Sequence, residues 1–172
     1  MPEVLDWQGA DQRAVVRHAV QALSEGRLVA FPTETAYHIT ASALSPAAVA
    51  ELSKHAASRT ESALMLVVRG GVEALDWAPG MSSLARRLTR RCWPGPVAFD
   101  CAEGVEQGLA SRLPHPVRQQ LCRDGVLRLC APGHEAILHT LQLLSGPLIA
   151  VGSGNGAGGP EPIVSALGEN AL

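Results

Sequence analysis

Short apolar runs that end at proline or glycine alternate along the chain with segments of helical periodicity, and this alternation constrains the fold most. The run "RLVAFP" (27–32) predicts a buried strand that ends at Pro32, because proline cannot donate to a strand ladder. The run "ALMLVV" (63–68) is continuous and apolar and stops before Gly70, which again indicates a buried strand. Interleaved strands and helices predict an α/β or α+β domain.

Five segments of helical periodicity and three further apolar runs complete this pattern. Residues 11–25 place apolar residues at helical spacing, with Asp11 as the N-cap and Gly26 as the stop. In the next helix Ser45 caps and Pro46 occupies the favoured first position. The predicted helices are 11–25, 45–56, 81–93, 115–124 and 134–146. The other predicted strands are 95–101, 125–130 and 147–151. No internal repeat or linker divides the chain, so we expect one domain over 1–172.

Composition limits what the core and the surface can be. Hydrophobic residues make up 47% of the chain but aromatic residues only 3%, so leucine, valine, alanine and isoleucine must fill the core. The net charge of −2 gives no overall attraction to nucleic acid, and an RNA contact would need a local basic patch. The arginines at 86, 87, 90 and 91 form such a cluster on a predicted helix, where a solvated face is the commoner explanation.

The cysteine pattern and the hydropathy of the chain predict where in the cell the protein is located. The four cysteines lack CxxC spacing, so we expect no metal site. No apolar run approaches the roughly 20 residues that span a bilayer, and residues 1–7 are acidic rather than apolar. We therefore expect a cytoplasmic protein with reduced thiols and no membrane association.

Hydroxyl groups follow the first predicted strand in "FPTETAYHIT" (31–40). Open α/β sheets place ligand sites at strand ends, so Thr33, Thr35 and Tyr37 are candidates for hydrogen bonds to a small polar ligand. A capped turn between two structural elements explains the same residues. The residues alone leave both interpretations open.

Two more sets of residues are candidates for an anion site. In "GSGNGAGG" (152–159) glycines let the backbone approach phosphates, and Ser153 and Asn155 add side-chain donors, although a flexible glycine turn fits equally well. The basic set is Lys54, Arg59 and Arg128. Arg128 stands inside the apolar strand "VLRLC", where a cation is costly unless it meets an anion. The six histidines show no catalytic partner by spacing, and a structural or exposed role is the simpler interpretation for each.

The order of four motifs resembles the YrdC-like family, the threonylcarbamoyl-AMP synthases of tRNA modification. "VAFPTETAYHI" is similar to that family's strand into PTET-x-YGL, and "CWPGPVAF" to its WPGP segment. "LRLCAP" is similar to its arginine-bearing strand, and "VGSGNGAGGP" to its Ser-x-Asn loop. The resemblance covers about residues 12–168.

The resemblance implies a twisted mixed sheet flanked by helices, with a large concave, positively lined cavity. It implies the condensation of L-threonine, bicarbonate and ATP, with Mg²⁺, to threonylcarbamoyl-AMP and pyrophosphate. By this resemblance the catalytic and nucleotide-binding residues are Lys54, Arg59, Ser153 and Asn155. The substrate-binding residues are Thr33, Thr35, Tyr37 and Arg128.

Several positions depart from the family pattern and leave alternatives open. Lys54 and Arg59 are five residues apart, where the family has Lys-x-Arg, and His38 replaces the glycine of YGL. Val67 stands where a histidine is common. An active synthase is one interpretation. A catalytically impaired paralogue that binds a nucleotide or RNA is another, and related carbamoyl-adenylate chemistry on a different acceptor is a third.

Overall fold

The computed structural model describes residues 3–9, 11–57, 63–152 and 163–165. Its helices are α1 (Gln12–Ser24), α2 (Pro46–Ala57), α3 (Gly71–Trp77), α4 (Ser83–Cys92), α5 (His115–Leu121) and α6 (Glu135–Leu143), with short 3₁₀ turns at Val105–Gln107 and Leu109–Arg112. Its strands are β1 (Glu3–Leu5), β2 (Val29–Pro32), β3 (Tyr37–Ser42), β4 (Met65–Val67), β5 (Gly95–Cys101), β6 (Cys122–Arg123), β7 (Val126–Ala131), β8 (Leu148–Gly152) and β9 (Ile163–Ser165).

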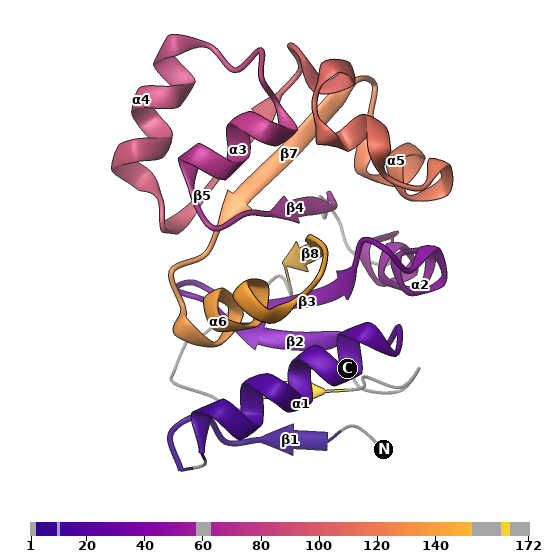
Figure 1. The fold of residues 1–172 in the computed structure, drawn as a ribbon, viewed down its shortest axis with the longest axis vertical. Helices are drawn as coiled ribbons and strands as arrows, with labels where there is room; N and C mark the ends of the chain where they lie inside the picture. Colours follow the sequence, from indigo (N-terminus) through magenta and orange to yellow (C-terminus); the bar gives the residue numbers. More distant parts are fainter. Residues whose placement is uncertain (1–2, 10, 58–62, 153–162, 166–172) are drawn as a thin grey trace.

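The described strands form one mixed sheet in the order β1-β9-β2-β3-β8-β4-β7-β5, with β6 paired to β7 (Figure 1). Only the β4–β7 pair is parallel among these strands, and the other pairs are antiparallel. Helices flank this sheet on both faces. The predicted mixed α/β sheet flanked by helices is therefore confirmed.

Alternation along the strands divides the core between the two faces of the sheet. Val29 and Phe31 of β2 pack with buried side chains of α1 and α6, whereas Leu28 and Ala30 pack with α2 on the opposite face. Helices α1 and α6 lie side by side over β2 and β3 (Figure 1). Helices α3 and α5 add to the second face, where they share a core cluster with Leu127 and Leu129 of β7.

One end of the sheet has a face without complete cover. The middle of β5, from Pro96 to Ala98, is exposed, and so is Asp100. Opposite them on β7, Cys130 is buried and Arg128 is partly exposed, so the partly open surface lies mainly along β5. This surface carries two of the hollows described below.

Capping and turn residues account for the ends of several elements. The side chain of Asp11 accepts a hydrogen bond from the Arg13 amide at the start of α1, as predicted, and Gly26 after this helix has a φ of 78°. Helix α5 ends earlier than predicted. Asp124 and Gly125, with φ values of 54° and 75°, form a tight turn that lets Cys122 and Arg123 pair as β6 with β7.

Within the described ranges, no helix is long and apolar enough to cross a membrane.

Candidate functional site

A four-residue turn, Thr33 to Ala36, joins β2 to β3 and carries the first predicted site residues. Pro32 pairs with Tyr37 across the hairpin, and the amide of Thr33 donates to the carbonyl of Ala36 at 3.0 Å. The hydroxyl of Thr33 donates to the same carbonyl and accepts from the Ala36 amide at 3.3 Å. The Thr33 hydroxyl therefore closes the turn, as a capped turn would require.

The turn is fastened to a distant loop through Glu34. The carboxylate of Glu34 accepts a hydrogen bond from the amide of Gly133, just after β7. A Cβ at Gly133 would lie 2.6 Å from that carboxylate oxygen, so the close approach depends on glycine. A carboxylate that accepts from a backbone amide makes a stronger bond than a neutral acceptor, so this contact holds the turn against the loop that follows β7.

A small hollow lies beneath the turn, with a volume of about 60 Å³. We call it the turn hollow. It brings together the turn, β3, β4, β5 and the end of β7 through Thr33, Glu34, Thr35, His38, Met65, Gly95, Pro96, Val97, Ala98, Cys130 and Pro132. The WPGP and PTET motifs, more than 55 residues apart in the chain, thus line one site. Thr33 and Thr35 are among its residues, and their role in substrate binding stays a prediction.

Tyr37 is not among the residues that line the turn hollow. Successive side chains of a strand point to opposite faces, and His38 is the neighbour that faces the hollow. The ring of Tyr37 instead packs against the core cluster that contains α2, α3 and α5. Its assignment as a substrate-binding residue stays a prediction.

His38 is the residue whose role sequence reasoning did not anticipate. Its ring is partly buried, and its Nδ1 atom has no hydrogen-bond partner among the described residues. Burial lowers the pKa of His38 below the ordinary 6.5, and the negative charge of Glu34 opposes this shift. The neutral imidazole is therefore favoured, and its Nδ1 atom is buried without a hydrogen-bond partner among the described residues.

We expect His38 to make the protein less stable in mild acid. The unfolded chain takes up a proton near the ordinary pKa, whereas the folded chain resists it to lower pH, so stability falls as pH decreases below about 6.5. His134, whose pKa is also lowered by burial, contributes in the same direction. The change in Tm between about pH 7.5 and pH 5.5 measures this effect.

His38→Gln should reduce that change in Tm, whereas Gln119→Ala, at an exposed residue without a titratable group, should leave it unchanged. Equal pH dependence in the wild type and the His38→Gln variant would contradict the lowered pKa.

Cys130 also lines the turn hollow but is unsuited to nucleophilic chemistry. Burial, and secondly the negative charge of Glu34, raises the pKa of its thiol to about 12. Reactive cysteines need a lowered pKa, because the thiolate is the nucleophile. Cys130 therefore acts as a small apolar wall.

Arg128 has an internal partner. Asp100 of β5 stands directly opposite it on β7, and the guanidinium donates to the two carboxylate oxygens at 2.6 and 2.7 Å. The Arg128 and Asp100 side chains are 37% and 48% exposed. Hydrogen bonds from Arg128 hold the pKa of Asp100 below its usual range. The positive charge of Arg128, which lies in an apolar strand, is thus balanced by Asp100 of the same chain.

The pair lines a second, shallow hollow of about 140 Å³, and Arg128 does not line the turn hollow. Arg128 and Cys130 are two residues apart on β7, so they lie on the same face of the sheet, roughly 7 Å apart. The two hollows are therefore neighbours along β7. A substrate anion that reaches Arg128 would compete with Asp100.

The remaining predicted residues are less informative. Lys54 is exposed in the last turn of α2 and lines neither hollow. Arg59, Ser153 and Asn155 lie outside the described residues. In α4, Arg86 donates to the carbonyls of Met81 and Pro79. The other three arginines of that helix are exposed.

No group of three or more histidine, cysteine, aspartate or glutamate side chains that could hold a metal ion occurs in the part of the chain that the structure describes.

Comparison with known proteins places these features in a family. The profile of the Sua5/YciO/YrdC family, described as "Telomere recombination", matches residues 21–168. The threonylcarbamoyl-AMP synthase of Pyrococcus abyssi is 29% identical over 147 residues, which cover 86% of this chain and 40% of that protein. The threonylcarbamoyl-AMP synthase of Methylococcus capsulatus is 31% identical over 122 residues, covering 63% of each. The chain thus spans less than two thirds of the length of these relatives.

Solved structures agree. The crystal structure of Pyrococcus abyssi Sua5 complexed with L-threonine superposes with a TM-score of 0.65 and 26% identity, over 81% of this chain and 38% of that one. Escherichia coli YciO, at 18% identity, superposes with a TM-score of 0.64 over 83% of this chain and 64% of its own, which supports the fold. On the sequence profile and on the fold, the chain belongs to the Sua5/YciO/YrdC family.

Proposed function

We propose that this chain is a threonylcarbamoyl-AMP synthase-like enzyme that condenses L-threonine, bicarbonate and ATP for threonylcarbamoyladenosine modification of tRNA. The turn hollow carries this proposal, because it joins Thr33 and Thr35 to the WPGP segment in a family whose Pyrococcus abyssi member has been solved with L-threonine. In the reaction the threonine amine and bicarbonate form a carbamate and water. A carbamate oxygen then bonds to the α-phosphorus of ATP, and pyrophosphate leaves.

Two polar groups of the turn hollow suit a threonine ligand. Thr33 already uses its hydroxyl to close the turn, so Thr35 carries the available hydroxyl. His38 lines the same hollow, and a neutral imidazole there can exchange a hydrogen bond with a hydroxyl or ammonium group. In this proposal Thr35 and His38 orient threonine while Glu34 holds the turn through Gly133.

The nucleotide must lie outside the turn hollow. A volume of about 60 Å³ is far below the roughly 300 Å³ of small-molecule sites, so only one end of a substrate can enter. The open surface along β5 leads from the turn hollow to the Asp100–Arg128 pair and can receive the phosphates. We assign Lys54, Arg59, Ser153 and Asn155 to nucleotide binding on the resemblance alone.

Mg²⁺ would accompany ATP in this reaction. Asp100 is paired with Arg128, and Glu34 accepts from Gly133, so both carboxylates near the two hollows are engaged. The described residues therefore fit an ion held mainly by the phosphates and water, as Mg²⁺ commonly is in nucleotide sites.

The Asp100–Arg128 pair favours a second candidate function. A guanidinium that already has a carboxylate partner attracts phosphate less, which is the condition of an impaired paralogue. Arg87, Arg90 and Arg91 form an exposed basic face on α4. Such a chain would act as a nucleotide- or RNA-binding module, with affinity that falls steeply as salt is added.

Mass spectrometry of the reaction products tests the first function. The protein is incubated with ATP, Mg²⁺, bicarbonate and L-threonine, beside a reaction without threonine. We expect a threonine-dependent adenylate and an equal amount of pyrophosphate. Thr35→Val, which removes a hydroxyl at nearly constant volume, should lower product formation by about tenfold.

Ser83→Ala is the matched control, because it removes an exposed hydroxyl at the start of α4, away from the turn hollow. Its product formation should equal that of the wild type. A folded wild-type protein that forms no adenylate, while a Methylococcus capsulatus synthase is active in parallel, would refute the enzyme and favour the binding module.

A further inference from the structure

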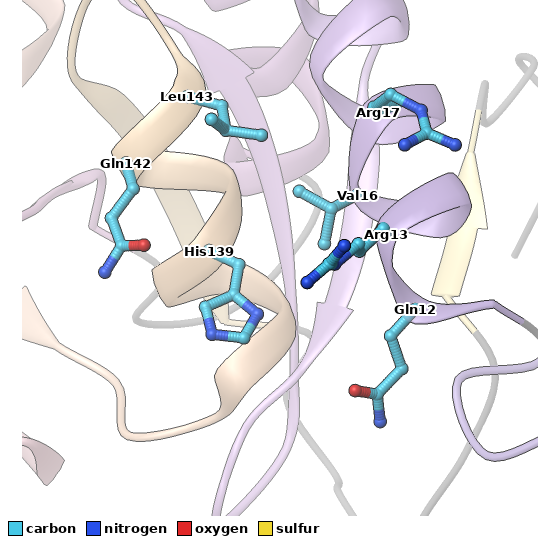
Figure 2. A pocket seen from close by; sticks show the side chains of 7 residues that line it. All are labelled: Gln12, Arg13, Val16, Arg17, His139, Gln142 and Leu143. Carbon is cyan, nitrogen blue, oxygen red and sulfur yellow. The ribbon is translucent and has the colours of Figure 1, made fainter.

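A cleft between α1 and α6 lies apart from the two hollows beside β7. It has a volume of about 430 Å³, several times that of the turn hollow. We call it the helix cleft, and Figure 2 shows its seven lining residues: Gln12, Arg13, Val16, Arg17, His139, Gln142 and Leu143. It shares no residue with the turn hollow, so a ligand there would not occupy the proposed threonine site.

The charged side chains of the helix cleft are all basic. Arg13 and Arg17 stand one turn apart on α1, and His139 lies on α6. In Figure 2 the guanidinium of Arg13 and the ring of His139 point toward one another across the cleft. An imidazole can donate an N–H in either protonation state, so two donors converge on one volume.

Neither arginine of the cleft has a counter-ion in the described part of the chain. The recorded ion pairs of this part involve neither Arg13 nor Arg17. Asp11, the nearest acidic residue in sequence, accepts from the backbone amide of Arg13 as the cap of α1. Unpaired basic groups around a concave surface create a positive potential that attracts an anion.

The rest of the cleft is suited to an organic group. Val16 is buried, and Leu143 is 61% exposed, which leaves apolar surface of the cleft in contact with water. Gln12 and Gln142 add amide donors. The volume falls within the roughly 300–1,000 Å³ of small-molecule sites, which combine apolar walls with a few polar groups.

We propose that the helix cleft binds a small organic phosphate monoester. The phosphate oxygens accept from the Arg13 guanidinium and the His139 N–H, and Arg17 adds positive charge to balance a dianion. The organic group covers Val16 and Leu143. A carboxylate carries one charge and two oxygens, so it satisfies this set of donors less completely. The proposal is independent of the synthase function.

Calorimetric titration of the 172-residue protein with phenyl phosphate tests the proposal, and amide NMR shifts locate the binding. We expect the largest shifts within 12–17 and 139–143. The double variant Arg13→Gln/His139→Gln should bind at least about tenfold more weakly, because two charge-assisted or polar hydrogen bonds are lost. Both side chains are exposed, and the ring contact that is lost is the tilted one between His139 and Trp7 at 6.5 Å, so the Tm of the variant should fall by no more than a few degrees.

Arg112→Gln is the matched control, since it removes an exposed arginine from the 3₁₀ turn Leu109–Arg112, outside the helix cleft, and its affinity should equal the wild type. Inorganic phosphate, which lacks the organic group, and benzoate, which lacks the phosphate, should each bind more weakly than phenyl phosphate. Equal affinity for benzoate, shifts outside the cleft, or an unchanged affinity in a folded double variant would each overturn the proposal. So would binding of a short RNA with no binding of phenyl phosphate.

Discussion

Replacing Phe31 by alanine is expected to lower the free energy of unfolding by about 3–5 kcal/mol. Phe31 is 0% exposed, at the point where β2 meets α1 and α6, and it precedes the turn by two residues. Its removal leaves a cavity in a core that contains few other aromatic rings, so neighbouring side chains cannot refill the space easily. Urea unfolding followed by tryptophan fluorescence measures the change.

Val72→Ala is the control for this variant. Val72 is 85% exposed in the first turn of α3, so its truncation should change the unfolding free energy by less than about 0.5 kcal/mol. A loss below about 1 kcal/mol in the Phe31→Ala variant would mean that the cluster between the sheet and α1 is poorly packed. It would also remove the argument that this cluster anchors the Thr33–Ala36 turn.

Much of the fold was predictable because local signals agreed with tertiary packing. The predicted strand 95–101 coincides with β5, and the predicted helix 11–25 contains α1 with its expected N-cap. In both segments the apolar pattern and the capping or turn residues indicate the same structure. Where local signals agree in this way, a helix or strand can be predicted without knowledge of the elements it packs against.

Other elements depend on contacts that local sequence does not display. Strand β3 (Tyr37–Ser42) was not predicted, because Thr40 and Ser42 interrupt its apolar pattern. Both are buried, and the Thr40 hydroxyl donates to the carbonyl of Val29 at 2.8 Å on the paired strand. Its polarity is satisfied by a neighbour 11 residues away. Helix α3 was missed because its Gly70-Gly71 start was interpreted as a strand stop.

Only the hydroxyl-rich turn of the candidate site was predictable from the sequence, and the contacts of the site were not. The hydroxyl-rich turn was identified from the strand end, and the structure places Thr33 and Thr35 together. The partner of Glu34 is 99 residues away, and that of Arg128 is 28 residues away. The order of the strands decides the first contact and the register of β5 with β7 decides the second, and both are properties of the assembled sheet.

The Asp100–Arg128 pair provides the sharpest test of whether phosphates reach β7. If the guanidinium binds a phosphate of ATP, Arg128→Gln should weaken ATP binding by at least about tenfold, as for other charge-assisted contacts. Asp100→Asn should then leave ATP affinity unchanged or raise it, because it removes the negative charge that competes for the same guanidinium. Titration calorimetry with ATP and Mg²⁺ measures both.

Both variants break the same ion pair. A difference between them in ATP affinity therefore separates a role of Arg128 in ligand binding from a structural role. A pair between side chains 37% and 48% exposed contributes only about 1 kcal/mol or less, so both variants should remain folded with similar Tm values. Arg112→Gln, at an exposed arginine that lines neither hollow, is the matched charge control and should bind ATP as the wild type does. If Asp100→Asn weakens ATP binding as much as Arg128→Gln, the pair only supports the strands, and Arg128 is not a phosphate ligand.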